Sequence, residues 1–440
     1  MLPDQTKLML NSVRIENFRA IELATVPLHP QLTVLIGDNA TGKTTVLEAI
    51  AIALQPFIRP FLSPQRRGQE ISASDFRVEA GDDLFGAPHR SGEIALVIDS
   101  SLGEISSRYD IDDGFADRPR IKRTLDRETG SWLEGILASE RTAPVLAYYR
   151  DNRGQVWGER GHFARRAQST RQGAYHLAFD TRVYFDEAVN WFEDAESAEL
   201  RDQREYGSDF RDHRLSAVRR AVEHLIPEVS DLRMLGRPPE LSMTLRNEGQ
   251  EPRLLTAGQL SSGFRTMLAL AMDLARRMAD LNPHLENPTE SPGVVLIDEI
   301  DLHLHPRWQQ LVIKGLVEAF PNVQFIMSTH SPQVLTTLRE ENILKLRWGN
   351  GRLEFEALPS TEGAEAGRLL TTVMGVSERP PSEVSAFVET LDRYRKFLRS
   401  DKADTPAALE ALQMMQNLSP DDPVLATLDL EKRRLEARRG

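Results

Sequence analysis

The sequence predicts an α/β fold with a mostly parallel central β-sheet flanked by helices. Short apolar runs typical of buried strands, such as QLTVLIG, VVLIDE and VQFIMST, alternate along the chain with segments that have helical periodicity. Buried strands that alternate with helices are typical of a parallel sheet covered on both faces. The first of these runs ends at Gly37 in a glycine-rich turn before a helical segment, which adds a strand–turn–helix unit.

Composition narrows the class of protein further. The 440 residues are 40% hydrophobic and 27% charged, as in globular core-forming chains. There is no cysteine, which excludes disulfides and thiolate metal sites and fits a cytoplasmic location. We find no run of eighteen apolar residues and no signal-peptide pattern, so we expect no membrane contact. The net charge of −12 means that any contact with DNA needs a local basic patch.

The N-terminal part, residues 1–154, is expected to form the first half of the core with an antiparallel β subdomain. Residues 10–28 alternate apolar and polar side chains and predict one or two antiparallel strands. A helix is expected from Thr44 to about Leu54, with Pro56 helping to stop it. Residues 57–90 resemble a surface excursion, 92–132 predict further strands, and VLAYY at 145–149 predicts a buried strand.

The rest of the chain is expected to form three further regions. Residues 155–230 show three- and four-residue apolar spacing and predict an inserted helical lobe. Residues 231–360 predict the second half of the core, with two short strands and then helices at Phe264–Met278 and Pro306–Phe320. Residues 361–440 predict a helical appendage with breaks at Pro380-Pro381 and around Pro420.

The first chemical motif is a complete GxxxxGK[ST] loop between a predicted strand and a predicted helix, the context that a phosphate-binding P-loop needs. Its glycines let backbone N–H groups surround phosphates, and the helix N-terminus adds its positive dipole end. Lys43 would pair with the β- and γ-phosphates of ATP, and Thr44 would ligate Mg²⁺. The predicted nucleotide-binding residues are Gly37, Asp38, Asn39, Ala40, Thr41, Gly42, Lys43, Thr44 and Thr45.

The second motif is VVLIDE, residues 294–299, in which a buried strand delivers two carboxylates at its C-terminal end. Asp298 would hold Mg²⁺ through water, and Glu299 would orient and deprotonate the attacking water. A buried strand that merely ends in surface acids is the alternative. The motif therefore predicts Mg-dependent ATP hydrolysis with Glu299 as the catalytic base.

Two further motifs are similar to those of ABC ATPases. Ser261, Ser262 and Gly263, in LSSGF, resemble the LSGGQ signature, with Ser262 and Phe264 replacing a glycine and the glutamine. The resemblance implies that this loop binds the γ-phosphate held by an opposite subunit; the alternative is an ordinary serine N-cap. His330 in FIMSTHSP stands where that family places a catalytic switch histidine.

The order of these motifs resembles the RecF/SMC-like branch of ABC ATPases. More narrowly, PVLAYYRDNRG, QLSSGFRTMLALAMDLARRM, GVVLIDEIDLHLHPRWQQ and VQFIMSTHSPQVL are similar to a bacterial group usually called predicted ATP-binding proteins involved in virulence. Members of that group resemble the ATPases of Septu-type and retron-linked anti-phage systems, often encoded beside an HNH nuclease. The similarity spans about residues 10–375.

The resemblance implies an ATP-switched homodimer with composite ATP sites that senses DNA or another nucleic acid and controls an HNH-type nuclease partner. The alternative is a RecF-like ATPase of DNA double-strand break repair or recombination. In the LHLHP segment, His303 and His305 would shape the dimer contact rather than bind a metal. No acidic nuclease module follows His330, so we expect no nuclease activity in this chain.

Several departures from the family pattern raise questions for the structure. Ala40 replaces a glycine of many relatives, which the loop tolerates if its φ is negative. No Q-loop glutamine is identified, and residues 150–153 are expected nearest the nucleotide. The basic stretch 150–171 contacts either a DNA backbone or the protein's own acids. The helices beyond about Ser382 serve either as a docking surface or as a packing appendage.

Overall fold

The structure is a computed structural model that divides into two compact units, Met1–Ala366 and Gly367–Gly440. The division lies a few residues beyond the predicted start of the appendage at 361. The structure describes residues 7–61, 71–79, 89–112, 120–125, 128–150, 170–179, 185–246, 249–349, 352–377, 379–400 and 402–437.

The first unit is organised around a six-stranded sheet with the order β16-β15-β3-β14-β13-β9, as predicted mostly parallel. Only β16 pairs antiparallel, with β15. Every residue of β3, β9, β13 and β14 is buried, because both faces of these strands are covered. The strands are β3 (Leu32–Ile36), β9 (Val145–Tyr149), β13 (Gly293–Ile297), β14 (Val323–Ser328), β15 (Ile343–Gly349) and β16 (Arg352–Glu356).

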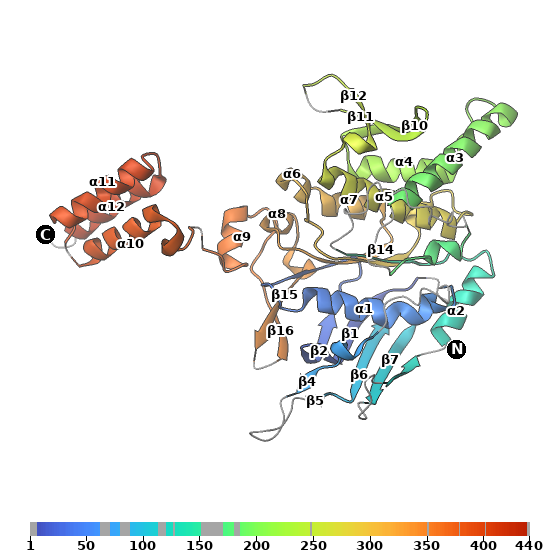
Figure 1. Ribbon diagram of the computed structural model, residues 1–440, viewed down its shortest axis with the longest axis horizontal. Coiled ribbons are helices and arrows are strands. Elements are labelled where there is room, and N and C mark those ends of the chain that lie inside the picture. Colours follow the sequence, from blue (N-terminus) through green and yellow to red (C-terminus); the bar gives the residue numbers. More distant parts are fainter. Residues whose placement is uncertain are drawn as a thin grey trace. The chain divides into compact units, whose positions relative to one another are not determined.

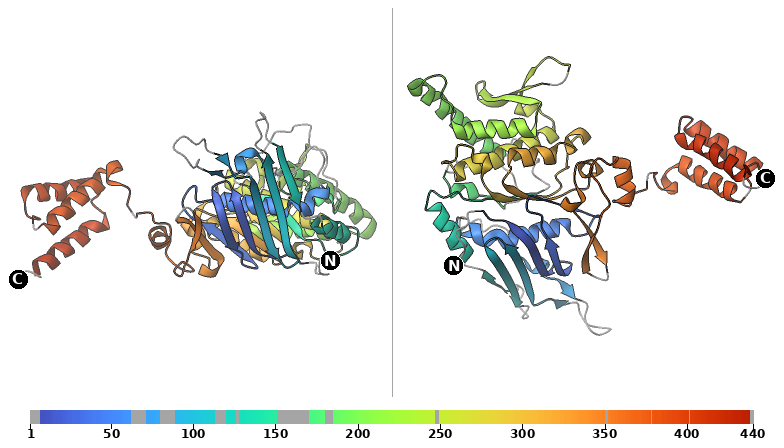
Figure 2. Two further views of the ribbon diagram at one scale, coloured as in Figure 1. Left: turned by 90° about the horizontal axis from the view of Figure 1, so that it is seen from below. Right: turned by 180° about the vertical axis from the view of Figure 1, so that it is seen from behind.

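The predicted β subdomain is an antiparallel sheet with the order β2-β1-β6-β7-β8. Helix α1 (Lys43–Ile58) lies between this sheet and the parallel one (Figures 1 and 2) and is therefore buried along nearly its whole length. The strands are β1 (Leu10–Phe18), β2 (Ile21–Pro27), β6 (Glu93–Ser100), β7 (Gly103–Asp112) and β8 (Arg120–Leu125), and a short hairpin joins β4 (Val78–Glu79) and β5 (His89–Arg90).

The other face of the parallel sheet is covered by helices, with a small antiparallel sheet β10-β11-β12 beyond them (Figure 1). No described helix combines the length and the apolar character that a membrane crossing demands. The helices are α3 (Phe185–Tyr206), α4 (His213–Leu225), α5 (Ser262–Leu281), α6 (Pro306–Gln309), α7 (Val312–Ala319) and α8 (Pro332–Leu335). The strands are β10 (Val229–Leu235), β11 (Glu240–Leu245) and β12 (Arg253–Thr256).

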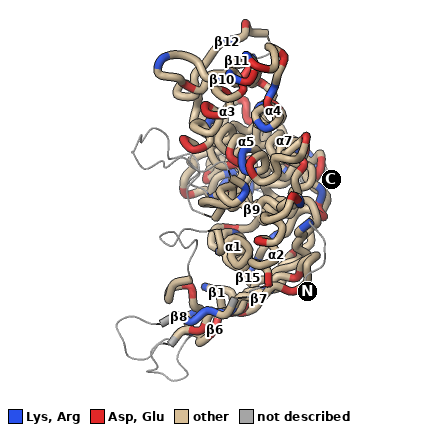
Figure 3. Tube along the Cα trace, turned by 90° about the vertical axis from the view of Figure 1, so that its right-hand side faces the viewer, with Lys and Arg blue, Asp and Glu red and all other residues tan. Residues whose placement is uncertain are grey.

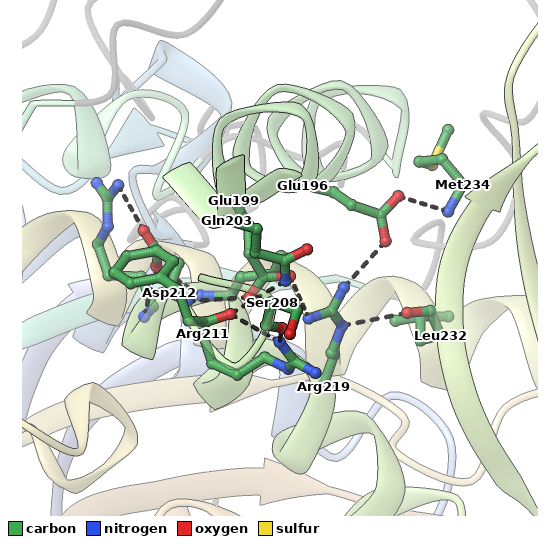
Figure 4. A network of polar contacts seen from close by, with 12 residues as sticks. Glu196, Glu199, Gln203, Ser208, Arg211, Asp212, Arg219, Leu232 and Met234 are labelled. Carbon is green, nitrogen blue, oxygen red and sulfur yellow. Dashed lines mark hydrogen bonds and ion pairs between the residues drawn. The ribbon is translucent and has the colours of Figure 1, made fainter. Parts of the chain in front are cut away.

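One arginine ties α3, α4 and β10 together (Figure 4). Arg219 on α4 donates to Glu196 and Glu199 on α3, at 2.9 Å in both cases, and to the carbonyl of Leu232 at 3.2 Å. Glu196 also accepts from the backbone N–H of Met234 at 2.8 Å. Burial raises the pKa of Glu196, and Arg219 counters this effect. Helices α3 and α4, which lie within the predicted lobe 155–230, are thus fixed to β10.

Several predicted boundaries were wrong. Pro56 lies inside the last turn of α1 rather than stopping it, and its missing N–H leaves the carbonyl of Ile52 without the usual helical hydrogen bond. The expected helix 306–320 is broken into α6 and α7, and residues 128–137 form α2 (Glu128–Leu137) rather than a strand. Strands β15 and β16 were not anticipated.

The second unit contains a three-helix bundle with a core of its own. Leu391, Tyr394, Met415 and Leu428 are among the buried side chains at its centre. The helices begin and end close to the proline breaks at 380–381 and 420 that the sequence predicted. They are α10 (Ala386–Arg399), α11 (Pro406–Leu418) and α12 (Pro423–Ala437), preceded by α9 (Ala366–Thr372) at the boundary of the units.

Helix α5 is buried along nearly all of its length and carries charges that must be neutralised inside the unit. Asp273 accepts from Arg276 and Arg277, at 2.7 Å each, and from the hydroxyl of Tyr149 on β9 at 2.9 Å. Arg277 also donates to the carbonyls of Ala174 and His176. Burial alone would raise the pKa of Asp273, but the two arginines hold it well below its ordinary value.

We expect Asp273→Asn to lower the free energy of unfolding by about 3–5 kcal/mol at pH 7, because it leaves buried guanidinium charge without its partner. A carboxylate with a depressed pKa stabilises the fold above its unfolded pKa of about 3.9, and this contribution is lost as pH falls toward the folded value. The difference between variant and parent should therefore shrink only below about pH 4. Thermal and denaturant unfolding between pH 3 and 8 measures it.

The matched control is Asp231→Asn, which removes the acid of an exposed pair with Arg233. Exposed pairs contribute roughly 0–1 kcal/mol, so this variant should unfold nearly as the parent does. Equal losses in the two variants would contradict the structural role assigned to Asp273.

Candidate functional site

The predicted site residues meet because three neighbouring strands run in the same direction. Strand β14 pairs in parallel with β3 on one side and with β13 on the other. The carboxyl ends of these strands therefore lie at one edge of the sheet, where β3 leads into the P-loop, β13 into Asp298 and Glu299, and β14 into His330.

These segments border a cleft of about 340 Å³, within the range of roughly 300–1,000 Å³ usual for small-molecule sites. Most of the P-loop, both carboxylates and His330 thus share one cavity, although they lie far apart in the sequence. Gly37, Asp38 and Thr41 are not among the described residues that line it. The described lining residues are Arg19, Ala20, Ile21, Asn39, Ala40, Gly42, Lys43, Thr44, Thr45, Asp298, Glu299, His330 and Trp348.

The P-loop has the backbone that phosphate binding requires. Gly37 has φ 147°, and a Cβ there would lie 2.7 Å from the carbonyl of Leu346 and from Thr41 Oγ1, so a side chain is excluded. Gly42, at φ 99°, forms the N-cap of α1, and no side chain caps this helix end. The N-terminus of α1 therefore presents its N–H groups and positive dipole end to the cleft.

Lys43 is held inside the loop. Its Nζ donates to the carbonyls of Gly37 at 2.8 Å and Asp38 at 2.9 Å. Burial lowers the pKa of Lys43, while Asp298 and Glu299 partly offset this effect. A buried ammonium group beside a helix N-terminus fits a polyphosphate, which would supply the negative charge at the positive end of the cleft.

Ser328, the last residue of β14, connects the two carboxylates. Its hydroxyl donates to Asp298 Oδ1 and accepts from the backbone N–H of Glu299 at 2.8 Å. Asp298 is buried, and its N–H donates to the carbonyl of Tyr149 at 2.8 Å. Asp298 is thus immobilised at the base of the cleft, as a metal-binding carboxylate requires.

Glu299 has a strained backbone. Its φ of 49° lies in the left-handed region, which costs a non-glycine residue roughly 1–2 kcal/mol. The conformation turns the chain sharply at the end of β13 and leaves Glu299 in the cleft. Strain of this kind is concentrated at functional sites, and it is consistent with the catalytic role predicted for Glu299.

Asp301 supports the end of β14. Its Oδ1 accepts from the hydroxyl of Thr329 at 2.5 Å and from the backbone N–H of His330 at 3.3 Å. The side chain of His330 remains exposed at the cleft. The segment that follows Glu299 therefore sets the position of the backbone at His330.

The signature residues occupy a different place. Ser261 is the N-cap of α5 and accepts from the N–H of Phe264 at 3.4 Å, so the ordinary capping role is present. A Cβ on Gly263 would overlap the carbonyl oxygen of His303, which explains the glycine. None of Ser261, Ser262 and Gly263 is among the described residues that line the cleft.

The histidines of the LHLHP segment have backbone roles. His303 has φ 65°, and its carbonyl lies against Gly263. His305 caps α6, its Nδ1 accepting from the N–H of Arg307 at 3.3 Å. Within the described ranges, neither belongs to a cluster of metal-ligating side chains.

Sequence reasoning missed Arg19 and Trp348 as residues of the cleft. Arg19 lies in the turn between β1 and β2, where it pairs with Glu48 on α1 and with Asp75 at 2.9 Å. Burial would lower the pKa of Arg19, but these two acids raise it. Arg19 belongs to residues 10–28, for which only strands were predicted, and Trp348 lies on β15, a strand that had not been predicted.

Arg150, the first residue of the stretch 150–153 that was expected nearest the nucleotide, is directed toward α1 rather than into the cleft. Its guanidinium pairs with buried Glu48 at 2.5 Å and lies over the ring of Tyr148, and Arg150 is not among the lining residues of the cleft. Residues 151–153 lie outside the described residues. Glu48, on the buried helix α1, is thus neutralised from two directions by Arg19 and Arg150.

Most of the basic stretch 150–171 lies outside the described residues, including Arg153, Arg160, Arg165 and Arg166. Its last member, Arg171, is structural, because its Nε donates to the carbonyl of Leu281 at 2.6 Å. Elsewhere, basic and acidic residues are interspersed along the described trace, with a basic segment at β8 (Figure 3). DNA contact by the stretch stays a prediction.

The loop was expected to tolerate an alanine at position 40 if its φ were negative, and this condition is not met. The φ of Ala40 is 64°, so an alanine stands in the left-handed region that favours glycine. We expect Ala40→Gly to raise the stability of the unit by up to about 1 kcal/mol, by removing the Cβ strain. Unfolding midpoints with and without nucleotide measure the effect.

The opposite substitution, Gly42→Ala, provides the control. A Cβ at Gly42 would meet no atom within 4 Å, so backbone strain at φ 99° is the only cost, and the midpoint should fall. If Ala40→Gly lowers the midpoint as well, φ at position 40 does not limit the loop.

Comparisons with known proteins agree with this geometry. A family described as "AAA domain, putative AbiEii toxin, Type IV TA system" matches residues 32–336. The chain is 27% identical to "Retron Ec83 probable ATPase" of Escherichia coli, over 97% of this chain and 86% of that protein. It is 43% identical to "OLD nuclease" of Thermus scotoductus, over 96% of this chain and 77% of that protein.

A shorter match covers 39% of this chain and 24% of "Septu protein PtuA" of Bacillus mycoides, at 33% identity. The expected similarity to retron and Septu ATPases is confirmed. The chain belongs to the family described as "AAA domain, putative AbiEii toxin, Type IV TA system", and it is an ATPase related to those of retron and Septu anti-phage systems.

Proposed function

We propose that this chain is an ATP-switched dimer in anti-phage defence, and that two copies complete each other's ATP sites. One observation carries the proposal: the signature residues Ser261, Ser262 and Gly263 do not line the cleft that contains Lys43 and Glu299. A second copy that presents its α5 N-terminus to the cleft would add an anion-binding helix end opposite the P-loop.

Within one chain, the cleft and the signature are connected by a short segment. Residues 298–305 begin with Asp298 and Glu299 in the cleft and continue to His303, whose carbonyl lies against Gly263. Asp301, in the middle, binds Thr329 and the N–H of His330. A change at the γ-phosphate could therefore reach the signature helix through packed backbone.

Hydrolysis would use the residues of the cleft in distinct roles. The N–H groups of the P-loop and Lys43 would hold the phosphates. Mg²⁺ would be held by Thr44 and Asp298 and would screen the phosphate charge. Glu299 would accept a proton from a water whose oxygen attacks the γ-phosphorus, breaking the bond to the β–γ bridging oxygen and releasing ADP and phosphate. His330 would donate a hydrogen bond to the γ-phosphate.

Glu299→Gln tests the dimer. The amide cannot accept the proton, so ATP turnover should fall at least about 100-fold, the typical contribution of general base catalysis. The variant should then accumulate as an ATP-bound dimer with Mg-ATP. Light scattering measures the mass, and phosphate release measures turnover.

A second substitution separates the cleft from the signature. Ser261→Arg in the Glu299→Gln background places a bulky cation at the exposed N-cap of α5, outside the cleft, so nucleotide binding should persist while the dimer is lost. A Glu299→Gln protein that binds ATP but stays monomeric at saturating Mg-ATP would refute the composite site.

The nuclease partner is the second part of the proposal. Its support is the similarity to Septu protein PtuA and to a protein named OLD nuclease, together with the expectation of an HNH-type partner from the family resemblance. Nucleic acid would be the signal, and the nucleotide state of the dimer would set the activity of the nuclease.

Reconstitution with an HNH nuclease encoded beside this chain tests the partnership. DNA cleavage by the complex should differ at least several-fold between ATP and ADP, and Glu299→Gln should hold it in the ATP state. The isolated chain should cleave no DNA. DNA-stimulated ATP turnover without a stable nuclease complex would instead favour the RecF-like repair function.

A further inference from the structure

Trp348 is the one Phe, Tyr or Trp side chain among the described lining residues of the cleft, and no motif assigns it a role. It lies on β15, which pairs in parallel with β3 up to the pair Lys345–Ile36. Trp348 lies just beyond that pair, beside the loop into which β3 leads. Its indole Nε1 donates to the carbonyl of Ala40 at 3.2 Å, which fixes the ring next to the P-loop.

The lining of the cleft divides into two kinds of surface. Lys43, Thr44, Asp298, Glu299 and His330 provide the charged and polar groups that suit phosphates, metal and water. A second part of the wall comes from the β1–β2 turn, the start of β2 and β15, and it includes Ala20, Ile21 and Trp348. Ile21 is fully buried, so Ala20 and Trp348 provide the accessible apolar surface.

The charge of Arg19, which also lies in this turn, is already neutralised. Its guanidinium pairs with Glu48 and with Asp75 at 2.9 Å. Its third neighbour is the ring of Phe18, at 5.0 Å from the guanidinium carbon. An aromatic ring, the exposed methyl group of Ala20 and a neutralised arginine form a poor site for a phosphate but a good one for a flat, weakly polar ring.

We propose that Trp348 is the platform on which the base of the bound nucleoside triphosphate stacks. The inference rests on the proposed ATP site and names the group that holds the other end of the same ligand. Stacking of a base on an aromatic side chain contributes about 1–3 kcal/mol and accepts any base, because every base has a π-face. The cleft should therefore prefer purines to pyrimidines by ring area and discriminate weakly between ATP and GTP.

The test compares a ligand that has a base with one that lacks it. Calorimetric titrations with AMPPNP and with inorganic tripolyphosphate, both with Mg²⁺, measure the affinities of the parent, Trp348→Phe, Trp348→Leu and Trp348→Ala. Loss of the ring in the Leu and Ala variants should weaken AMPPNP binding about tenfold, the equivalent of about 1.4 kcal/mol. Tripolyphosphate binding should change less than about twofold, and Trp348→Phe should retain most of the AMPPNP affinity.

Other outcomes overturn the inference. Equal weakening of both ligands would mean that Trp348 only supports the P-loop through Ala40, and unchanged AMPPNP affinity in Trp348→Leu would mean that the base lies elsewhere. Nucleotide quenching of tryptophan fluorescence should vanish in Trp348→Phe and persist in Trp308→Phe, since Trp308 packs against Phe264 outside the cleft. Tripolyphosphate that fails to bind the parent, or binds Lys43→Ala equally well, would refute the phosphate site itself and with it the proposed function.

Discussion

The parallel pairing of β3, β14 and β13 is the constraint on which the site depends. Parallel neighbours end at the same edge of a sheet, so three motifs that are far apart in the sequence meet without any long-range recognition between their own side chains. Ser328 shows how tightly this edge is defined, since one hydroxyl at the end of β14 contacts Asp298 and the N–H of Glu299 on the neighbouring strand. A register shift of one residue would separate these groups and turn buried side chains to the opposite face.

The two most deeply buried helices each carry charge, and in each case the charge connects them to their surroundings. Glu48 on α1 is shared by Arg19 and Arg150, which come from near the two ends of the N-terminal region 1–154. Asp273 on α5 is shared by two arginines of its own helix and by Tyr149 on β9. Buried ions require such partners, because an unpaired charge in the interior is very costly. The P-loop helix and the signature helix are thereby held in defined positions beside the same sheet.

Part of the backbone strain of the first unit lies around the same edge. Ala40, Glu299 and His303 all have positive φ, and they belong to the P-loop, the end of β13 and the contact with α5. Each conformation costs roughly 1–2 kcal/mol for a residue with a Cβ, so the surrounding packing must enforce it. The close approach of His303 to Gly263 is one such packing contact, and it depends on the absence of a side chain at Gly263.

The amino-acid sequence alone predicted the α/β class, the parallel sheet and most of the polar lining of the cleft. Of the predicted residues, the cleft contains Asn39, Ala40, Gly42, Lys43, Thr44, Thr45, Asp298, Glu299 and His330. These features depend on local periodicity and on motifs with a defined strand–turn–helix context, which short segments carry in full. The positions of Trp348 and Arg19 in the cleft and the pairing of Arg150 with Glu48 became visible only in the three-dimensional structure. The same holds for the separation of Ser261, Ser262 and Gly263 from the cleft of their own chain. These outcomes depend on which strands become neighbours and which buried charges find partners, and such long-range relations leave no periodic pattern in the sequence.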